Sequence, residues 1–69
     1  MATIADRLVL LQKEKGLQKK DIAKAAGVSL MGYYRYEQGI RQPSASVIVA
    51  LADFFGVSAD YLLGRSDKP

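Results

Sequence analysis

The stretch KKDIAKAAGVSLMGYYRY, from Lys19 to Tyr36, contains two short helical patterns that meet at a single glycine, Gly27. Two helices that are joined by a tight turn and cross steeply need a small side chain where their backbones approach, and Ala23 supplies it. The turn needs a residue that tolerates a positive φ angle, which Gly27 does. We therefore predict a helical hairpin whose apolar residues seal it against a third helix. These residues are Ile22, Ala26, Val28, Tyr33 and Tyr36.

A hinged pair of this kind suits a second helix that projects from the domain and enters the major groove of DNA. The alternative is an ordinary helical hairpin in a small bundle, where the same alanine and glycine serve packing alone. The hairpin residues leave both interpretations open, so the surrounding sequence has to decide between them.

Capping residues and apolar spacing predict five helices in all and no strand. The expected helices cover 4–15, 18–25, 30–37, 45–55 and a short segment after Ser58. Four of them begin after a good capping residue, namely Thr3, Ser29, Ser44 or Ser58, whereas Gln18 is a weak cap. Leu62 and Leu63 in the last helix are expected to close the core. We predict an all-α fold, with one domain over residues 1–64 and a tail or the start of a linker over 65–69.

The composition of the 69-residue chain excludes several classes of function. It contains no cysteine and no histidine, so it lacks a thiolate metal site, the commonest metal ligand and the usual general base. Serines and carboxylates remain, but none has an activating base at a recognisable spacing. We expect neither an enzyme nor a metal or cofactor site. No apolar run approaches the roughly 20 residues of a membrane span, and a cytoplasmic location is the default expectation.

The net charge of +3 is concentrated around the hairpin. Between residues 13 and 41 there are seven basic and three acidic side chains, whereas the rest of the chain has three basic and four acidic ones. A phosphate backbone favours such a distribution, although a solvated lysine surface is common in proteins without one.

The chain resembles the N-terminal DNA-binding domains of phage repressors and Cro proteins, the XRE-type helix-turn-helix family. The resemblance covers nearly the whole chain, from about residue 4 to residue 64. The segments that carry it are LQKEKGL (11–17), DIAKAAGVS (21–29), RYEQG (35–39), RQPS (41–44) and ALADFFGVSADYLLG (50–64). It implies a compact five-helix domain whose third helix lies in the major groove and which binds two half-sites as a dimer.

The resemblance also implies which positions face DNA. The base-facing positions are Ser29, Leu30, Met31, Tyr34 and Arg35. The phosphate-facing positions are Gln18, Lys19, Gln38 and Arg41, to which the charge pattern adds Lys20. Arg35 is the only long, fork-shaped donor in the third helix, so it can read guanine, contact a phosphate or pair with a nearby acid. Tyr34 can reach a phosphate through its hydroxyl or lie against a sugar.

Three features depart from the family pattern. Gln12 stands where the family usually has an arginine that pairs with the glutamate found here at Glu37, so this carboxylate needs another partner or solvent. Val9 and Leu10 lie off the apolar stripe of the first helix, and they form either a broad core face or an exposed patch. Leu30 and Met31 have no side-chain hydrogen-bonding groups. They could contact thymine methyl groups or wedge against a base step, or they indicate a helix that discriminates poorly between DNA sequences.

These observations predict a DNA-binding transcriptional regulator, most simply a repressor that binds a pseudo-palindromic operator. Alternatives are an antitoxin and a protein-interaction module that uses the apolar surface. Double-stranded DNA and a second copy of the chain are the expected partners, and a toxin, an antirepressor or a missing C-terminal domain are possible protein partners. Candidates for the contact between copies, each with core packing as the alternative, are Tyr61, Leu62, Val47, Val49 and Ala50.

Overall fold

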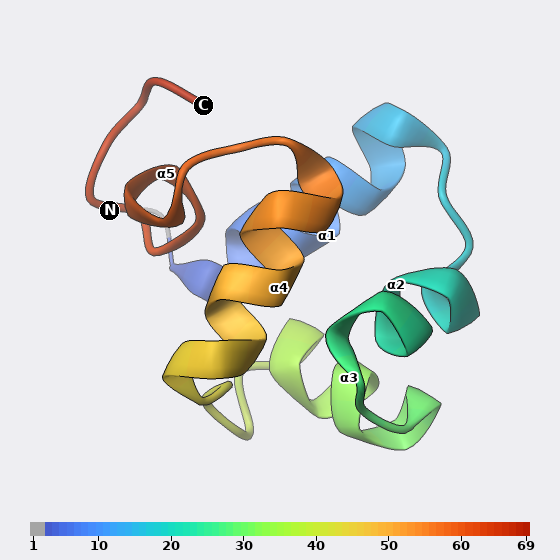
Figure 1. Ribbon diagram of the computed structural model, residues 1–69. Helices are drawn as coiled ribbons and strands as arrows, with labels where there is room; N and C mark the ends of the chain where they lie inside the picture. Colours follow the sequence, from blue (N-terminus) through green and yellow to red (C-terminus); the bar gives the residue numbers. More distant parts are fainter. Residues whose placement is uncertain (1–2) are drawn as a thin grey trace.

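The computed structural model describes residues 3–69, and these form five α-helices without a strand. In chain order the helices are α1 (Ile4–Lys15), α2 (Lys19–Ala26), α3 (Leu30–Glu37), α4 (Ala45–Phe55) and α5 (Ala59–Leu62). The predicted all-α, five-helix fold is therefore confirmed, with α2 and α3 joined by the tight turn at Gly27 (Figure 1).

Side-chain capping explains why four of the helices begin where the sequence predicts. The Thr3 hydroxyl accepts from the Asp6 N–H while the Asp6 carboxylate accepts from the Thr3 N–H, which makes a reciprocal capping box. A serine hydroxyl accepts from the N–H three residues on at the starts of α3, α4 and α5. Gln18 makes no such bond, and α2 runs one residue later at each end than predicted, from Lys19 to Ala26.

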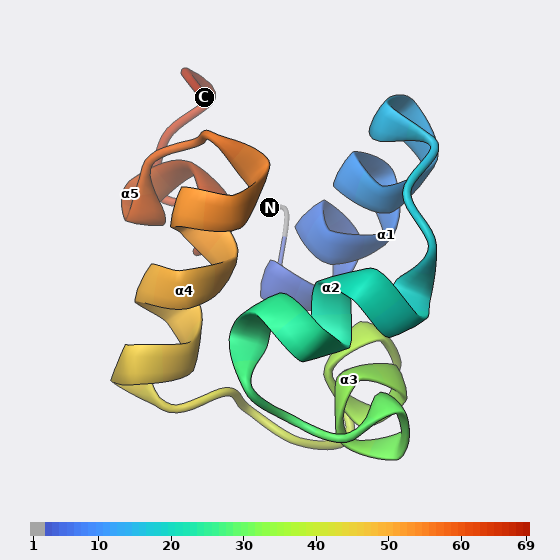
Figure 2. The same ribbon diagram turned by 45° about the vertical axis from the view of Figure 1, so that its right-hand side comes forward.

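The helices pack around one apolar cluster to which all five contribute. α2 packs against α3 and α4, α1 against α3 and α5, and α4 against α5 (Figure 2). The side chains with the least exposure come from every helix, and they are Leu8, Ile22, Tyr33, Leu51 and Leu62. α3 consequently lies at one end of the domain, held by its inner face against α1 and α2 (Figure 1).

One apolar prediction is wrong, and the burial of other apolar residues bears on two alternatives that the sequence left open. Leu63 does not close the core, because it follows the single turn of α5 and is 39% exposed, whereas Leu62 is fully buried. Tyr61 and Leu62 are both buried, as the core-packing alternative expects. In α1, Leu10 is exposed and Val9 half-buried, so the off-stripe residues form an apolar surface more than a broad core face.

The C-terminal residues lie against the beginning of α1. The Arg7 guanidinium is 4.0 Å from the centre of the Tyr61 ring, within the range of a cation–π contact. One of its nitrogens donates to the Ser66 carbonyl at 3.4 Å and to the Asp67 carboxylate at 3.2 Å. Residues 65–69 therefore lie beside α5, on the side of the domain away from α3 (Figures 1 and 2). None of the helices among residues 3–69 is long and apolar enough to span a membrane.

The turn at Gly27 offers a test of the hinge. Its φ of +74° lies in the left-handed region, and a Cβ at this position would meet nothing within 4 Å. Replacing Gly27 by alanine should therefore cost backbone strain alone, about 1–2 kcal/mol of the free energy of unfolding, measured by urea denaturation. Gly27→Asn should cost less, because asparagine enters this region more readily. Equal losses in the two variants would contradict this explanation.

Candidate nucleic-acid interface

The two faces of α3 differ sharply in burial. Tyr33 and Tyr36 are buried in the core, and their spacing of three residues places them on one face of the helix. The predicted base-facing side chains Met31 and Arg35 point away from this face and are exposed. Leu30 lies at the edge of the inner face, three residues before Tyr33, and is 39% exposed, while Tyr34 is half-buried. Ser29 is exposed and its hydroxyl accepts from the Gly32 N–H, so it acts as the helix cap.

The predicted phosphate-facing residues lie at the two ends of the hairpin sequence. Gln18 and Lys20 lie at the start of α2, and Gln38 and Arg41 follow the end of α3. All four are exposed, and neither Lys20 nor Arg41 forms an ion pair within the described chain. Lys19 differs from them because its ammonium group is already engaged.

Lys19 is paired with Glu37 across the hairpin. Its Nζ lies 2.8 Å from Glu37 Oε1, and the Glu37 side chain is only 7% exposed. The amide of Gln12 donates to the Leu17 carbonyl at 2.7 Å, so it is engaged elsewhere. Lys19 therefore takes the place of the arginine that usually pairs with this glutamate, and it is the cationic partner of Glu37.

The hydroxyl of Tyr33 lies in the same buried region. Neither this hydroxyl nor Glu37 Oε2 has a hydrogen-bond partner by strict geometry within residues 3–69. Burial raises the pKa of the Tyr33 phenol well above its ordinary value, and the nearby Glu37 carboxylate is the second cause. The hydrogen bond to Glu37 raises the pKa of Lys19 in turn.

These two pKa shifts predict that the folded chain loses stability at alkaline pH. Tyr33 and Lys19 both hold their protons more tightly in the folded chain than in the unfolded one, so unfolding is favoured once the unfolded groups titrate, above about pH 10. The Tyr33 proton alone contributes a slope of about 1.4 kcal/mol per pH unit there. Urea denaturation from pH 8 to 11 measures it. Tyr33→Phe should make the slope shallower, and an unchanged slope would contradict the assignment.

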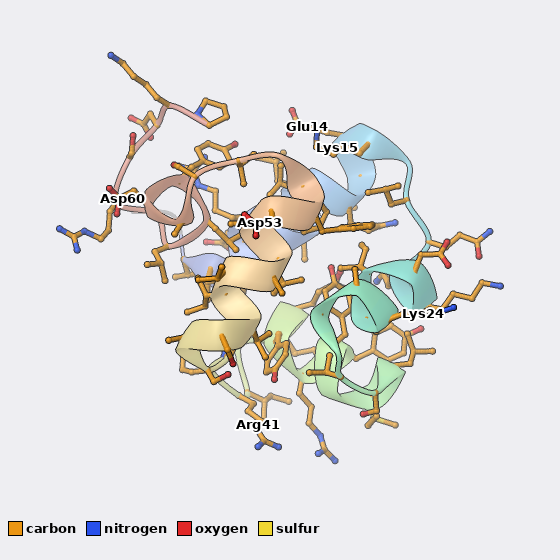
Figure 3. The ribbon with its side chains drawn as sticks, in the orientation of Figure 1. Glu14, Lys15, Lys24, Arg41, Asp53 and Asp60 are labelled. Atoms are coloured by element: carbon orange, nitrogen blue, oxygen red, sulfur yellow. The ribbon has the colours of Figure 1, made fainter. Side chains whose placement is uncertain are left out.

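Figure 3 shows where several of the charged side chains lie, with Lys15 beside Glu14 at the end of α1. In Figure 3, Glu14, Asp53 and Asp60 lie on the α1, α4 and α5 side, away from α3. Arg41 projects at the α3 end of the domain, and Lys24 extends from α2 on another side of it (Figure 3). A polyanion would therefore meet positive charge first when it approaches α3.

Two contacts were missed by sequence reasoning. The Lys19–Glu37 pair joins residues 18 positions apart, and Arg7 contacts residues of the C-terminal tail about 60 positions away. The absence of the family's usual arginine partner for Glu37 indicated that this carboxylate needs another partner or solvent, and the first contact supplies that partner. Nothing in the spacing of Arg7 indicated the second.

A protein of this architecture is a helix-turn-helix protein, and the chain belongs to that family: the helix-turn-helix family model matches residues 10–62. This family consists of DNA-binding proteins and not of enzymes.

Among curated proteins, the chain is 40% identical over 63 residues to the HTH-type transcriptional regulator AnsR of Bacillus subtilis, a match that covers 91% of this chain and 54% of AnsR. It is 39% identical over 56 residues to the uncharacterized HTH-type transcriptional regulator YazB of the same organism, with 81% of each covered. The chain thus spans about half the length of AnsR.

Among solved structures, the fold matches the P22 c2 repressor, crystallised in complex with the synthetic operator 9T, at a TM-score of 0.87 and 23% identity. The match covers 96% of this chain and 100% of that one. At this level of identity the likeness establishes the fold.

Proposed function

We propose that the chain is a sequence-specific double-stranded DNA-binding domain of a transcriptional regulator, and that it acts as a repressor. The observation that carries the proposal is the division of α3, whose two buried tyrosines fix the helix while its outer face stays exposed. The exposed Arg41 projects at the same end of the domain (Figure 3). Family membership, the names of the relatives and the operator-bound P22 c2 repressor support the same function.

Arg35 is the proposed reader of a guanine. It is exposed on α3, and no acid among the described residues pairs with it. The fork of a guanidinium matches guanine O6 and N7 in the major groove. Pairing with a neighbouring acid, one of the three roles open to Arg35 from the sequence, has no support in the described ion pairs.

Leu30 and Met31 are the proposed apolar readers at the start of α3. Met31 is 59% exposed and Leu30 is 39% exposed, so both present methyl and methylene groups at the surface. The groups that such side chains recognise in the major groove are thymine methyls. Tyr34 and Ser29 complete the base-facing set.

Backbone phosphates are the proposed ligands of the residues at the two ends of the hairpin, Gln18, Lys20, Gln38 and Arg41. The free N–H groups at the start of α2 add to them, because the helix N-terminus carries partial positive charge and its Gln18 cap makes no side-chain bond. Such contacts position a protein on the duplex without reading its sequence.

A dimer on two half-sites is proposed, with the half-site centres one helical turn, about 34 Å, apart. Of the contact candidates, Val49 is 55% exposed on α4 with the half-buried Ala50 beside it, whereas Val47 packs against the core. The proposed mode of action is that the bound domain blocks a promoter. The proposed location is the cytoplasm, where the chromosome is accessible.

Selection of binding sites from a random duplex pool tests this function. The selected duplex and a scrambled one are then titrated with the protein at several salt concentrations. A palindromic site bound about a thousandfold more tightly than scrambled DNA is the expected result. Equal, salt-sensitive binding to both duplexes would contradict sequence-specific recognition, and absence of binding would contradict a DNA ligand altogether.

A further inference from the structure

Lys19 lies at the start of a helix where an exposed cation could meet a phosphate, yet its ammonium group points into the hairpin. The contact with Glu37 links the first residue of α2 to the last residue of α3. The Lys19 side chain is 40% exposed and the Glu37 side chain 7%, so the carboxylate is the buried member of the pair. A buried carboxylate that loses its only cation is strongly destabilising.

Within residues 3–69, no other cation pairs with Glu37. The amide of Gln12 is bonded to the Leu17 carbonyl, and Glu37 Oε2 already lacks a partner. Moving Lys19 outward to a phosphate would leave the buried carboxylate without its cation. The pair therefore holds the lysine in place.

Lys19 also touches a residue of the proposed base-reading face. Its Nζ lies 5.4 Å from the centre of the Tyr34 ring, within the range of a cation–π contact. One ammonium group thus contacts α3 at two places, Tyr34 near its middle and Glu37 at its end. Both contacts restrain how α3 is presented relative to α2.

We propose that Lys19 is a positioning residue that fixes α3 and the Tyr34 ring for DNA reading, and that it contacts no phosphate itself. This assignment replaces the phosphate contact expected from the family resemblance, and its DNA-binding part rests on the proposed function. The ligand of the Lys19 ammonium in the complex remains Glu37.

The salt dependence of operator binding separates the two roles. Each phosphate contact that is lost lowers the slope of log K against log salt by about 0.9, because fewer counterions are released. Three variants are compared with the native chain: Lys19→Gln, which keeps an N–H donor and loses the charge, Lys19→Arg, which keeps both, and the matched control Lys20→Met. All are titrated with the selected operator at temperatures where each is folded.

We expect Lys19→Gln to bind the operator about tenfold more weakly with an unchanged salt slope, and Lys19→Arg to restore binding. Lys20→Met should lower the slope by about 0.9. A fall of this size in Lys19→Gln would overturn the proposal, since it would identify a lost phosphate contact. Native affinity in Lys19→Gln would overturn it as well.

A measurement on the free protein tests the contact between Lys19 and Tyr34 independently of the proposed DNA-binding function. In NMR spectra of the free protein, Lys19→Gln should shift the Tyr34 ring resonances, whereas Lys20→Met should leave them in place. Shifted resonances in a chain that binds no DNA would support the positioning contact while the proposed function fails. Unmoved resonances would overturn the contact whatever the DNA result.

Discussion

Replacing Tyr33 by alanine is expected to lower the free energy of unfolding by about 3–5 kcal/mol, the range for removal of a large buried aromatic side chain. Tyr33 has no exposed surface and is the largest of the fully buried side chains. A domain of this size has a total stability of about 3–10 kcal/mol, so the variant should be close to unfolded at 37 °C. Urea and thermal denaturation followed by circular dichroism measure the loss.

Met31→Ala is the matched control for Tyr33→Ala. The two residues lie on the same helix, but Met31 is 59% exposed and faces away from the core. Its truncation should change the free energy of unfolding by no more than about 0.5 kcal/mol. Similar losses in the two variants would show that α3 is not anchored by its inner face, which would remove the physical basis for a rigid reading helix.

Replacing Arg35 by alanine is expected to cost about 1–3 kcal/mol of operator binding and to relax the preference at one guanine position. Affinity for scrambled duplex should fall much less, because the base contact is specific and the phosphate contacts remain. Binding titrations against the selected operator and against its three variants at that base pair measure both effects. Stability should change little, since Arg35 is exposed.

Arg41→Ala distinguishes a base contact from a phosphate contact. Arg41 is also exposed and unpaired within the described chain, but it lies in the loop after α3. Its removal should weaken binding to all duplexes alike and lower the salt slope by about 0.9. If Arg35→Ala behaves in the same way, Arg35 contacts a phosphate and sequence is read by other residues.

Local sequence signals predicted the fold nearly completely. Ser29 and Ser44 mark helix starts because their hydroxyls satisfy a free N–H, and Gly27 marks the hinge because it accepts a positive φ. The inward direction of Tyr33 also followed from helical spacing, and the structure confirms it. These features depend on residues three or four positions apart, which is the range over which a sequence pattern determines geometry.

Predictions that depended on tertiary contacts were less successful. Leu63 is apolar and adjacent to the buried Leu62, but α5 is a single turn, too short for a spacing pattern to distinguish its inner residues from its outer ones. The ammonium group of Lys19 could reach either solvent or Glu37, and only the packing of α2 on α3 determines which. The direction of a long, flexible side chain cannot be inferred from periodicity.

The Arg7 contact with the C-terminal residues has a practical consequence for binding experiments. Because Ser66 and Asp67 are held beside the beginning of α1, the chain leaves the domain on the side opposite to α3 (Figures 1 and 2). A biotin or a fluorescent dye attached after Pro69 should leave the outer face of α3 unobstructed. The domain can therefore be immobilised on a sensor surface by its C-terminus, with α3 facing the solution.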